Sequence, residues 1–189
     1  MIKDVISNVK AFGFEDSIKA SKYPMSVDID SCSDEITPNV KSLGCCEKGS
    51  GHDQFLTGII VQYDLTFSIK AWVEAQRYHF LDFVSSQSTM HRITKFDVEK
   101  QCNGYVDEII CNRLQDLIAE YNNDPTPSNY LRVVYNIPTG FKLTARMTTN
   151  YRQLKTIYHQ RKNHPLPEWT MFCDWCESLP YFCEICTKE

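Results

Sequence analysis

The sequence has no glycine-rich phosphate loop: neither G-x-G-x-x-G nor G-x-x-x-x-G-K-[ST] occurs, and only seven of its 189 residues are glycine. The dinucleotide-binding fingerprint and the P-loop are therefore excluded. No apolar run approaches the ~20 residues that a membrane-spanning helix requires, and the first ten residues lack the apolar core of a signal peptide. A net charge of −4 argues against a broad nucleic-acid surface. We expect a cytoplasmic protein with no membrane partner and no sequence-specific nucleic-acid partner.

Cysteine is abundant but odd in number. There are nine cysteines, which in a chain without a secretion signal indicates reduced thiols. Cys173, Cys176, Cys183 and Cys186 form two C-x-x-C units, and four such thiolates suit tetrahedral zinc. However, the six-residue gap between the units is short for structural zinc sites, and the first unit lies on an apolar helical stretch. We expect structural or unliganded thiols and no metal, with zinc as the alternative.

Residue periodicity predicts several helices and at least one strand. Helical patterns cover residues 15–22, 72–83, 106–121, 150–163 and 168–179, and a further helix opens at Pro38 with Thr37 as its cap. Residues 57–68 are rich in β-branched and aromatic side chains and predict a strand. The remaining expectations are a loop at 84–89, a strand or buried helical turn at 131–137, an irregular segment at 139–147, and a helix cap at Thr148 or Thr149. We find no repeat and no dividing linker, so we expect one domain over residues 1–189.

The stretch from Trp72 to Arg92 gathers cationic and hydroxyl side chains. Arg77 and His79 stand near the end of the predicted helix, and the polar run from Ser85 follows at once. The planar donor fork of arginine matches phosphate, and serine hydroxyls can complete the shell. This pattern favours an anion site, most naturally for phosphate. The alternative is a solvated helix end with ordinary polar side chains.

Two further arginines, Arg152 and Arg161, lie nine residues apart on the predicted helix 150–163. We expect them to share roughly one face of that helix and to contribute to the same site. Because Lys155 and Lys162 are close in the sequence, a basic, solvated helix is the alternative.

Three ordered motifs resemble those of the flavin-dependent thymidylate synthases. Gly51-His52-Asp53 before the predicted strand is similar to that family's GHxSxxEH opening. Arg77-Tyr78-His79, followed by Ser85-Ser86-Gln87-Ser88, resembles its Arg-His-Arg signature and NEQS stretch. Ile137-Pro138, then Asn150-Tyr151-Arg152-Gln153-Leu154 with Arg161 downstream, resembles LP…NARSLxxFxxLR. Together these motifs cover most of residues 40–180.

The resemblance implies an α+β fold, with a mixed or antiparallel sheet packed against helices, in a homotetramer whose nucleotide sites lie between subunits. It also implies that the chain binds FAD and dUMP and uses methylenetetrahydrofolate and NADPH as co-substrates. By position, the flavin would be bound by His52, Arg77, Tyr78 and His79. The uridine nucleotide would be bound by Gln87, Ser88, Arg92, Asn150, Arg152 and Arg161, of which Ser88 and Arg161 are the expected catalytic residues.

The sequence also departs from that family's motifs. Tyr78-His79 replace the His-Arg of the signature, Ser86 replaces the Glu of NEQS, and Thr57-Gly58 stand near the place of Glu-His. An imidazole titrates near neutral pH whereas a guanidinium stays charged, so His79 is a weaker anion ligand than arginine. Two hypotheses follow. One is an enzyme that reductively methylates uracil; the other is a non-catalytic relative that serves as a nucleotide-binding or protein-interaction module.

Overall fold

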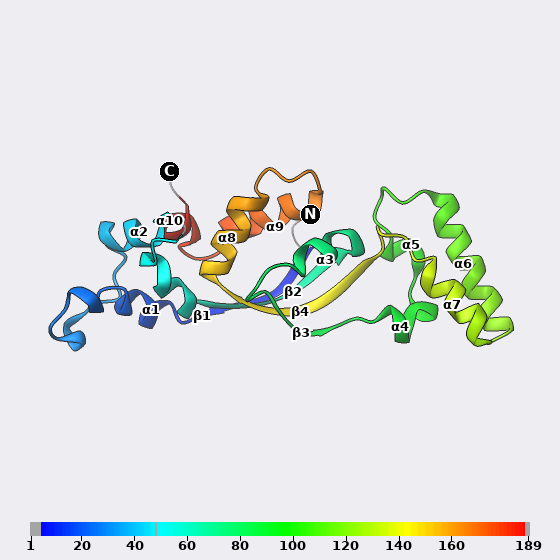
Figure 1. The fold of residues 1–189 in the computed structure, drawn as a ribbon, viewed down its shortest axis with the longest axis horizontal. Coiled ribbons are helices and arrows are strands. Elements are labelled where there is room, and N and C mark those ends of the chain that lie inside the picture. The colour runs from blue at the N-terminus through cyan, green and yellow to red at the C-terminus, as the bar shows by residue number, and fades with distance from the viewer. Residues whose placement is uncertain (1–4, 48, 188–189) are drawn as a thin grey trace.

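An antiparallel sheet crosses the middle of an elongated molecule (Figure 1). The computed structural model describes residues 5–47 and 49–187. The sheet has four strands in the order β1-β2-β4-β3, and each neighbouring pair is antiparallel. The strands are β1 (Ile6–Phe12), β2 (Ile60–Ser68), β3 (Asp82–Ser86) and β4 (Lys142–Asn150). The expected α+β class, with a sheet packed against helices, is confirmed.

Helices cover one face of this sheet and extend beyond both of its ends. The α-helices are α1 (Phe14–Ala20), α2 (Pro38–Gly44), α3 (Ile69–Ala75), α4 (Thr89–Arg92), α5 (Val98–Gln101), α6 (Glu108–Asn123), α7 (Pro127–Tyr135), α8 (Tyr151–Arg161), α9 (Pro167–Ser178) and α10 (Phe182–Cys186). Short 3-10 helices are η2 (Tyr23–Met25), η3 (Ile29–Ser31), η4 (His52–Gly58) and η5 (Ile93–Lys95). In Figure 1, α8 and α9 lie over the sheet, α1, α2 and α10 gather at one end, and α4 to α7 at the other. Among the described residues, no helix combines the length and apolar character needed to cross a bilayer.

The main core lies between the sheet and its helical layer. Alternate side chains of β2 are fully buried against this layer, whereas those between them face the other side and are only partly buried. The buried set on β2 is Val61, Tyr63, Leu65 and Phe67. Aromatic side chains of α9 complete the layer, because Trp169 and Phe172 pack against Phe67 at centroid distances of 4.9 and 6.2 Å. One face of the sheet is therefore apolar and the other polar, as in many antiparallel sheets.

Strand β4 replaces the irregular segment that was expected at residues 139–147. It pairs with β2 along its whole length, from Ser68↔Lys142 to Ile60↔Asn150. Ala145 and Met147 face the core, while Thr144 and Arg146 face the polar side. The expectation was wrong because few large apolar residues mark the buried face of this strand.

Other boundaries also differ from expectation. The helix expected at 72–83 ends at Ala75, and β3 occupies residues that were assigned to the helix end and to the loop at 84–89. Residues 131–137 fall largely in α7, whose start is capped by the Thr126 side chain, so the strand alternative is wrong. Helix α8 is capped by Asn150 and not by Thr148 or Thr149, because Asn150 ends β4 and directly precedes the first residue of the helix, Tyr151.

The strongest helical patterns in the sequence correspond to helices in the structure. Thr37 caps α2 by accepting a hydrogen bond from the Val40 amide at 3.4 Å, with Pro38 in the first position. Helices α6 and α9 appear within two residues of their predicted bounds.

Candidate functional site

A groove of about 540 Å³ lies between α8 and the turn that follows α3. The turn contributes Arg77, Tyr78 and His79 to its lining, and α8 contributes Gln153, Thr156, Gln160 and Arg161. Gln153, Thr156 and Gln160 have the i, i+3, i+7 spacing of one helix stripe. Two motif segments far apart in the sequence therefore meet at a cavity of the size usual for small-molecule sites.

The turn after α3 presents Arg77 and His79 to solvent. The Tyr78 amide donates to the Ala75 carbonyl at 3.1 Å and closes the turn. Phe80 then adopts a left-handed backbone with φ of 61°, which is unusual for a bulky residue. The Phe80 carbonyl accepts a hydrogen bond from the Thr149 hydroxyl at 2.6 Å, which ties this reversal of the chain to β4.

Arg161 is buried at the base of the groove and bonded within its own chain. Its Nε donates to the Tyr78 hydroxyl at 2.7 Å, and its Nη1 pairs with Glu74 Oε2 at 2.6 Å. Its guanidinium carbon lies 4.7 Å from the ring centroid of Trp169, which is a cation–π distance. Arg161 and Tyr78 thus form a bonded floor, and removal of the Glu74 carboxylate would leave the buried Arg161 charge without a carboxylate partner.

Two further side chains that can carry positive charge lie close to the Glu74 carboxylate. His164 Nε2 lies 3.1 Å from its carboxylate, and Lys70 Nζ lies 3.5 Å away. Burial raises the pKa of Glu74, but attraction from His164, Arg161 and Lys70 outweighs burial, so the pKa lies below its usual 4.5. A pKa that is lower in the folded than in the unfolded state contributes stability at neutral pH, and this contribution is lost as pH falls through the folded pKa.

We expect Glu74→Gln to lower the melting temperature at pH 7, because it removes the carboxylate from Arg161. The deficit relative to the original protein should shrink below about pH 4.5, where the original carboxyl itself becomes protonated. Thermal unfolding between about pH 3 and 8 measures this, with exposed Glu99→Gln as the control that should follow the original protein throughout. A Glu74→Gln deficit that stays constant across this range would contradict the account.

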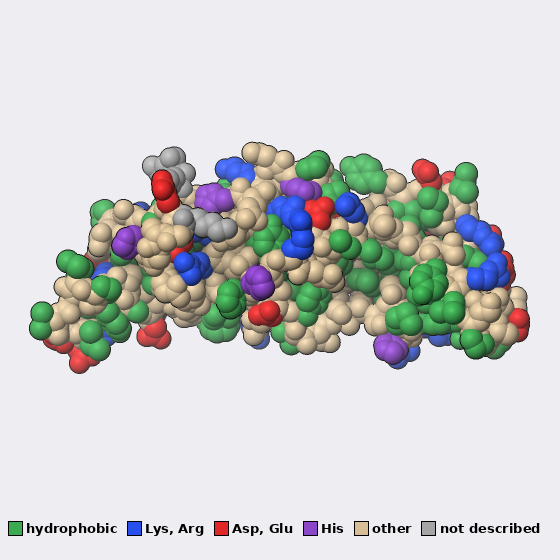
Figure 2. Space-filling view, in the orientation of Figure 1, with side chains coloured by type: hydrophobic (Ala, Val, Ile, Leu, Met, Phe, Trp, Pro, Cys, Tyr) green, Lys and Arg blue, Asp and Glu red, His purple; other side chains and the backbone are tan. Residues whose placement is uncertain are grey.

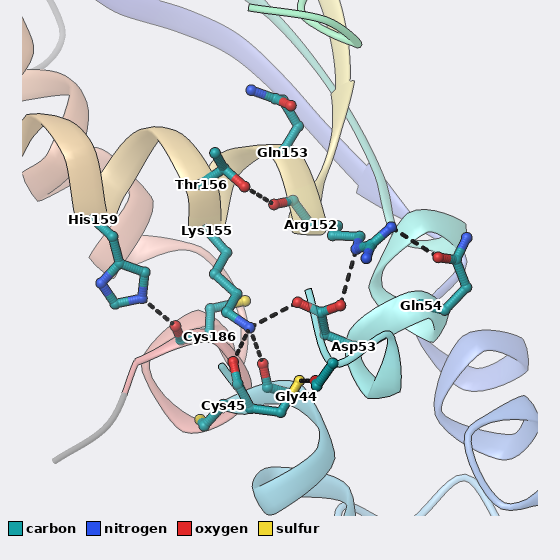
Figure 3. Close-up of polar contacts among 12 residues, drawn as sticks. Gly44, Cys45, Asp53, Gln54, Arg152, Gln153, Lys155, Thr156, His159 and Cys186 are labelled. Atoms are coloured by element: carbon teal, nitrogen blue, oxygen red, sulfur yellow. Dashed lines mark hydrogen bonds and ion pairs between the residues drawn. The ribbon is translucent and has the colours of Figure 1, made fainter. Parts of the chain in front are cut away.

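Beside the groove, another stripe of α8 carries Lys155, whose ammonium group makes three hydrogen bonds to oxygen atoms (Figure 3). Its Nζ donates to Asp53 Oδ2 at 2.8 Å and to the carbonyls of Gly44 and Cys46 at 2.7 and 2.9 Å. These three acceptors match the three donors of an ammonium group. Lys155 and Asp53 are both buried, so Lys155 fastens α8 to η4 and to the end of α2.

Arg152 binds the other oxygen of the same carboxylate. Its Nε donates to Asp53 Oδ1 at 2.9 Å, and its Nη1 donates to Gln54 Oε1 at 2.8 Å (Figure 3). The Arg152 side chain remains 35% exposed, whereas that of Asp53 is 7% exposed. Arg152 is thus anchored on one side and accessible to solvent on the other.

Arg152 and Arg161 do not share a face of α8, contrary to expectation. Nine residues span about two and a half turns of an α-helix, and the half turn places the two side chains on opposite sides. Arg152 accordingly pairs with Asp53 of η4, and Arg161 with Glu74 of α3. The alternative, a basic and solvated helix, is also wrong for Lys155, which is buried.

Two other expected ligand residues have different surroundings. His52 is exposed at the start of η4 and borders a separate cavity of about 980 Å³, together with Gln54 and Phe55. Asn150 caps α8, because its side-chain oxygen accepts a hydrogen bond from the Gln153 amide at 2.9 Å.

Gln87, Ser88 and Arg92 lie beyond β3, away from the Arg77 groove. Gln87 lines a different cavity of about 310 Å³ with Trp72 and Phe83. Ser88 precedes α4, and Arg92 ends it in an exposed position. The described residues that line the groove therefore do not include these three.

Sequence reasoning missed several residues of the site: Asp53, Glu74, Lys155, Thr156 and Gln160. The sequence did contain a signal for Lys155, since it follows Arg152 by three residues and must share its face. Asp53 directly follows His52 within the Gly51-His52-Asp53 motif, whereas the pairing of Glu74 with Arg161 carries no local signal, because Arg161 comes from a distant segment.

Three of the four C-terminal cysteines are core residues. Cys173, Cys176 and Cys186 are buried, and burial raises the pKa of each thiol, that of Cys173 to about 12. Cys183 is exposed on α10. Throughout residues 5–47 and 49–187, no three His, Cys, Asp or Glu side chains are placed to hold a metal ion. In this structure the four thiols are therefore not arranged as a set of zinc ligands.

Comparison with known proteins gives matches in structure but not in sequence. No protein-family model and no curated protein matches the chain. A crystal structure of flavin-dependent thymidylate synthase ThyX from Helicobacter pylori, complexed with FAD and dUMP, superposes with a TM-score of 0.73 at 14% identity, covering 96% of this chain and 100% of that one. The chain has the fold of the flavin-dependent thymidylate synthases.

Two further structures share this ThyX fold. Another Helicobacter pylori ThyX structure with FAD and dUMP gives a TM-score of 0.74 at 16% identity, covering 97% of this chain and 100% of that one. The UMP/dUMP methylase PolB from Streptomyces cacaoi, bound with 5-Br UMP, gives 0.62 at 11% identity, covering 95% of this chain and 91% of that one. The resemblance first seen in the motifs is thus confirmed for the fold.

Proposed function

We propose that the chain is a flavin-dependent thymidylate synthase-like enzyme that binds dUMP and FAD and reductively methylates the uracil ring. Methylenetetrahydrofolate would supply the one-carbon unit and NADPH the reducing equivalents. The observation that carries this proposal is the groove in which Arg77, Tyr78 and His79 meet the Gln153 to Arg161 face of α8. The Helicobacter pylori enzymes of the same fold hold FAD and dUMP, which supports the choice of ligands.

The groove residues fit a flavin nucleotide. Arg77 offers an exposed donor fork suited to a diphosphate. His79, Thr156 and Gln160 add groups that can donate or accept hydrogen bonds. FAD, when bound, supplies the hydride chemistry, and the part of this chain is to bind the cofactor, orient it and exclude water.

Arg152 is the residue we assign to the nucleotide phosphate. It lies in the first turn of α8, an eleven-residue helix whose N-terminus favours negative charge. Its side chain is 35% exposed, and the next residue along the helix, Gln153, lines the groove. Arg161, which is held by Glu74 and Tyr78, instead acts through the position of Tyr78.

A homotetramer would complete the site. Gln87, Ser88 and Arg92 do not line the groove of their own subunit, so we propose that they reach the groove of a neighbouring one and that Ser88 contacts the nucleotide there. The proposed reaction uses folate and nucleotide pools, and the buried, reduced thiols of α9 suit the same compartment, so we place the protein in the cytoplasm.

Shared sites predict complementation between defective subunits. We expect Arg152→Ala and Ser88→Ala homo-oligomers to release little tritium from dUMP labelled at C5. Hybrids formed by co-expression should recover activity, because some sites would combine two intact contributions. Hybrids that are no more active than the parent variants would show that both residues serve the same subunit's site or neither serves a site.

One observation favours a second candidate, a non-catalytic nucleotide-binding module. Tyr78 and Arg161, both within the motif segments, are bonded to each other at 2.7 Å, and Arg161 also pairs with Glu74. If these contacts persist with ligand bound, the floor is a structural unit. dUMP binding without flavin binding, and without tritium release in the presence of FAD, NADPH and methylenetetrahydrofolate, would select this candidate.

A further inference from the structure

Asp53 is a buried carboxylate placed between two cations. Its Oδ1 accepts from Arg152 and its Oδ2 from Lys155, at 2.9 and 2.8 Å. In the part of the chain that the structure describes, neither cation pairs with any other carboxylate. One negative charge therefore faces two positive charges, and the cluster carries one positive charge in excess.

The burial and the hydrogen bonds of the two cations show which of them can offer the excess charge to a ligand. Lys155 is buried, and its three donors are occupied by Asp53, Gly44 and Cys46. Arg152 has only its Nε and Nη1 engaged, and its side chain is 35% exposed. The excess charge is thus carried by Arg152 in the first turn of α8, whose remaining N–H groups bond to no other described residue.

We propose that Asp53 is a positioning residue, an inference that rests on the proposed function. By holding Nε of Arg152, Asp53 fixes the guanidinium so that the outward edge of the guanidinium receives the nucleotide phosphate. Lys155 holds Asp53 in place from the other side and joins it to the end of α2. Gln54 supplies the second fixed point on Arg152 through Nη1. Asp53 itself does not touch the phosphate, whose charge has the same sign.

The direction in which Asp53→Asn changes the affinity for dUMP distinguishes a positioning role from a purely electrostatic one. Asp53→Asn removes a negative charge near the phosphate site, so a site governed only by charge would bind dUMP more tightly. The positioning role predicts the opposite, because an asparagine side chain cannot accept from both cations and Arg152 loses its anchor. We expect about tenfold weaker dUMP binding, the usual effect of losing a charge-assisted hydrogen bond.

The test measures dUMP and deoxyuridine binding by titration calorimetry with FAD present. In Asp53→Asn, dUMP affinity should fall while deoxyuridine affinity, which involves no phosphate, should stay unchanged. Gln54→Ala, at an exposed position, should give a smaller loss in the same direction. Asp64→Asn is the matched control, because Asp64 pairs with Arg146 on the polar face of the sheet. This variant should bind both ligands as tightly as the original protein.

A second measurement requires no nucleotide. The Nε–H proton of Arg152, assigned by its absence from the spectrum of Arg152→Lys, should exchange slowly in the original protein and rapidly in Asp53→Asn. A slow proton in a protein that binds no dUMP would defeat the proposed function while leaving the anchored arginine established. An Nε–H that exchanges equally fast in both proteins, or dUMP binding in folded Asp53→Asn as tight as in the original, would overturn the positioning role.

Discussion

Arg152→Ala is expected to weaken dUMP binding by about 10- to 100-fold, the range for losing charge-assisted hydrogen bonds to a phosphate. The fold should survive, because the side chain is partly exposed and Asp53 keeps its bond to Lys155. Calorimetric titration of dUMP in the presence of FAD measures the change directly.

Arg146→Ala is the matched control for that experiment. Arg146 is also a partly buried arginine paired with an aspartate, but it lies on the polar face of the sheet. The Arg146→Ala variant should leave dUMP affinity unchanged within about twofold, since the charge of Arg146 is not part of the proposed site. Equal losses in the two variants would indicate a general electrostatic effect, and no loss in Arg152→Ala would remove Arg152 from the site.

Trp169→Ala is expected to cost about 3–5 kcal/mol of unfolding free energy, as for other large core residues cut back to alanine. Trp169 is fully buried, packs on Phe67 and Phe172, and lies over the guanidinium of Arg161. A loss of that size should lower the melting temperature by roughly 10 °C in a chain of this length.

Two further variants show whether the lost stability comes from the buried volume of Trp169. Among the described residues, the indole N–H of Trp169 has no hydrogen-bond partner, so Trp169→Phe removes volume but no hydrogen bond and should cost clearly less. Tyr105→Ala removes an aromatic side chain that is 83% exposed and should leave the melting temperature nearly unchanged. A Trp169→Ala protein as stable as Tyr105→Ala would contradict the placement of α9 over the sheet.

Local sequence signals predicted the elements whose stability is encoded locally. Helix α2 has its Thr37 cap and its proline, and α9 has a complete aromatic face. Strand β4 could not be recognised in the same way, because its polar residues are satisfied by pairing with β2 and only the fold shows which side is buried. The turn at Phe80 was also hidden, since its left-handed backbone is held by Thr149, far away in the sequence.

The candidate site was predictable in its residue types but not in its pairing. Arg77, Arg152 and Arg161 were all singled out from the sequence, yet only the structure shows that Arg161 is bonded to Glu74 and that Arg152 is anchored by Asp53. Such partners come from different segments, and no single stretch of sequence specifies them. The error about the faces of α8 was avoidable, because half a turn separates residues nine apart.

The visible absorption spectrum of the purified protein, before and after addition of FAD and dUMP, tests the central claim most directly. The account predicts a flavin band that stays with the protein through gel filtration, bleaches on reduction, and is weaker in Arg77→Ala. A protein that stays colourless after incubation with FAD and dUMP, while folded and oligomeric, would contradict the assignment of the groove to a flavin nucleotide.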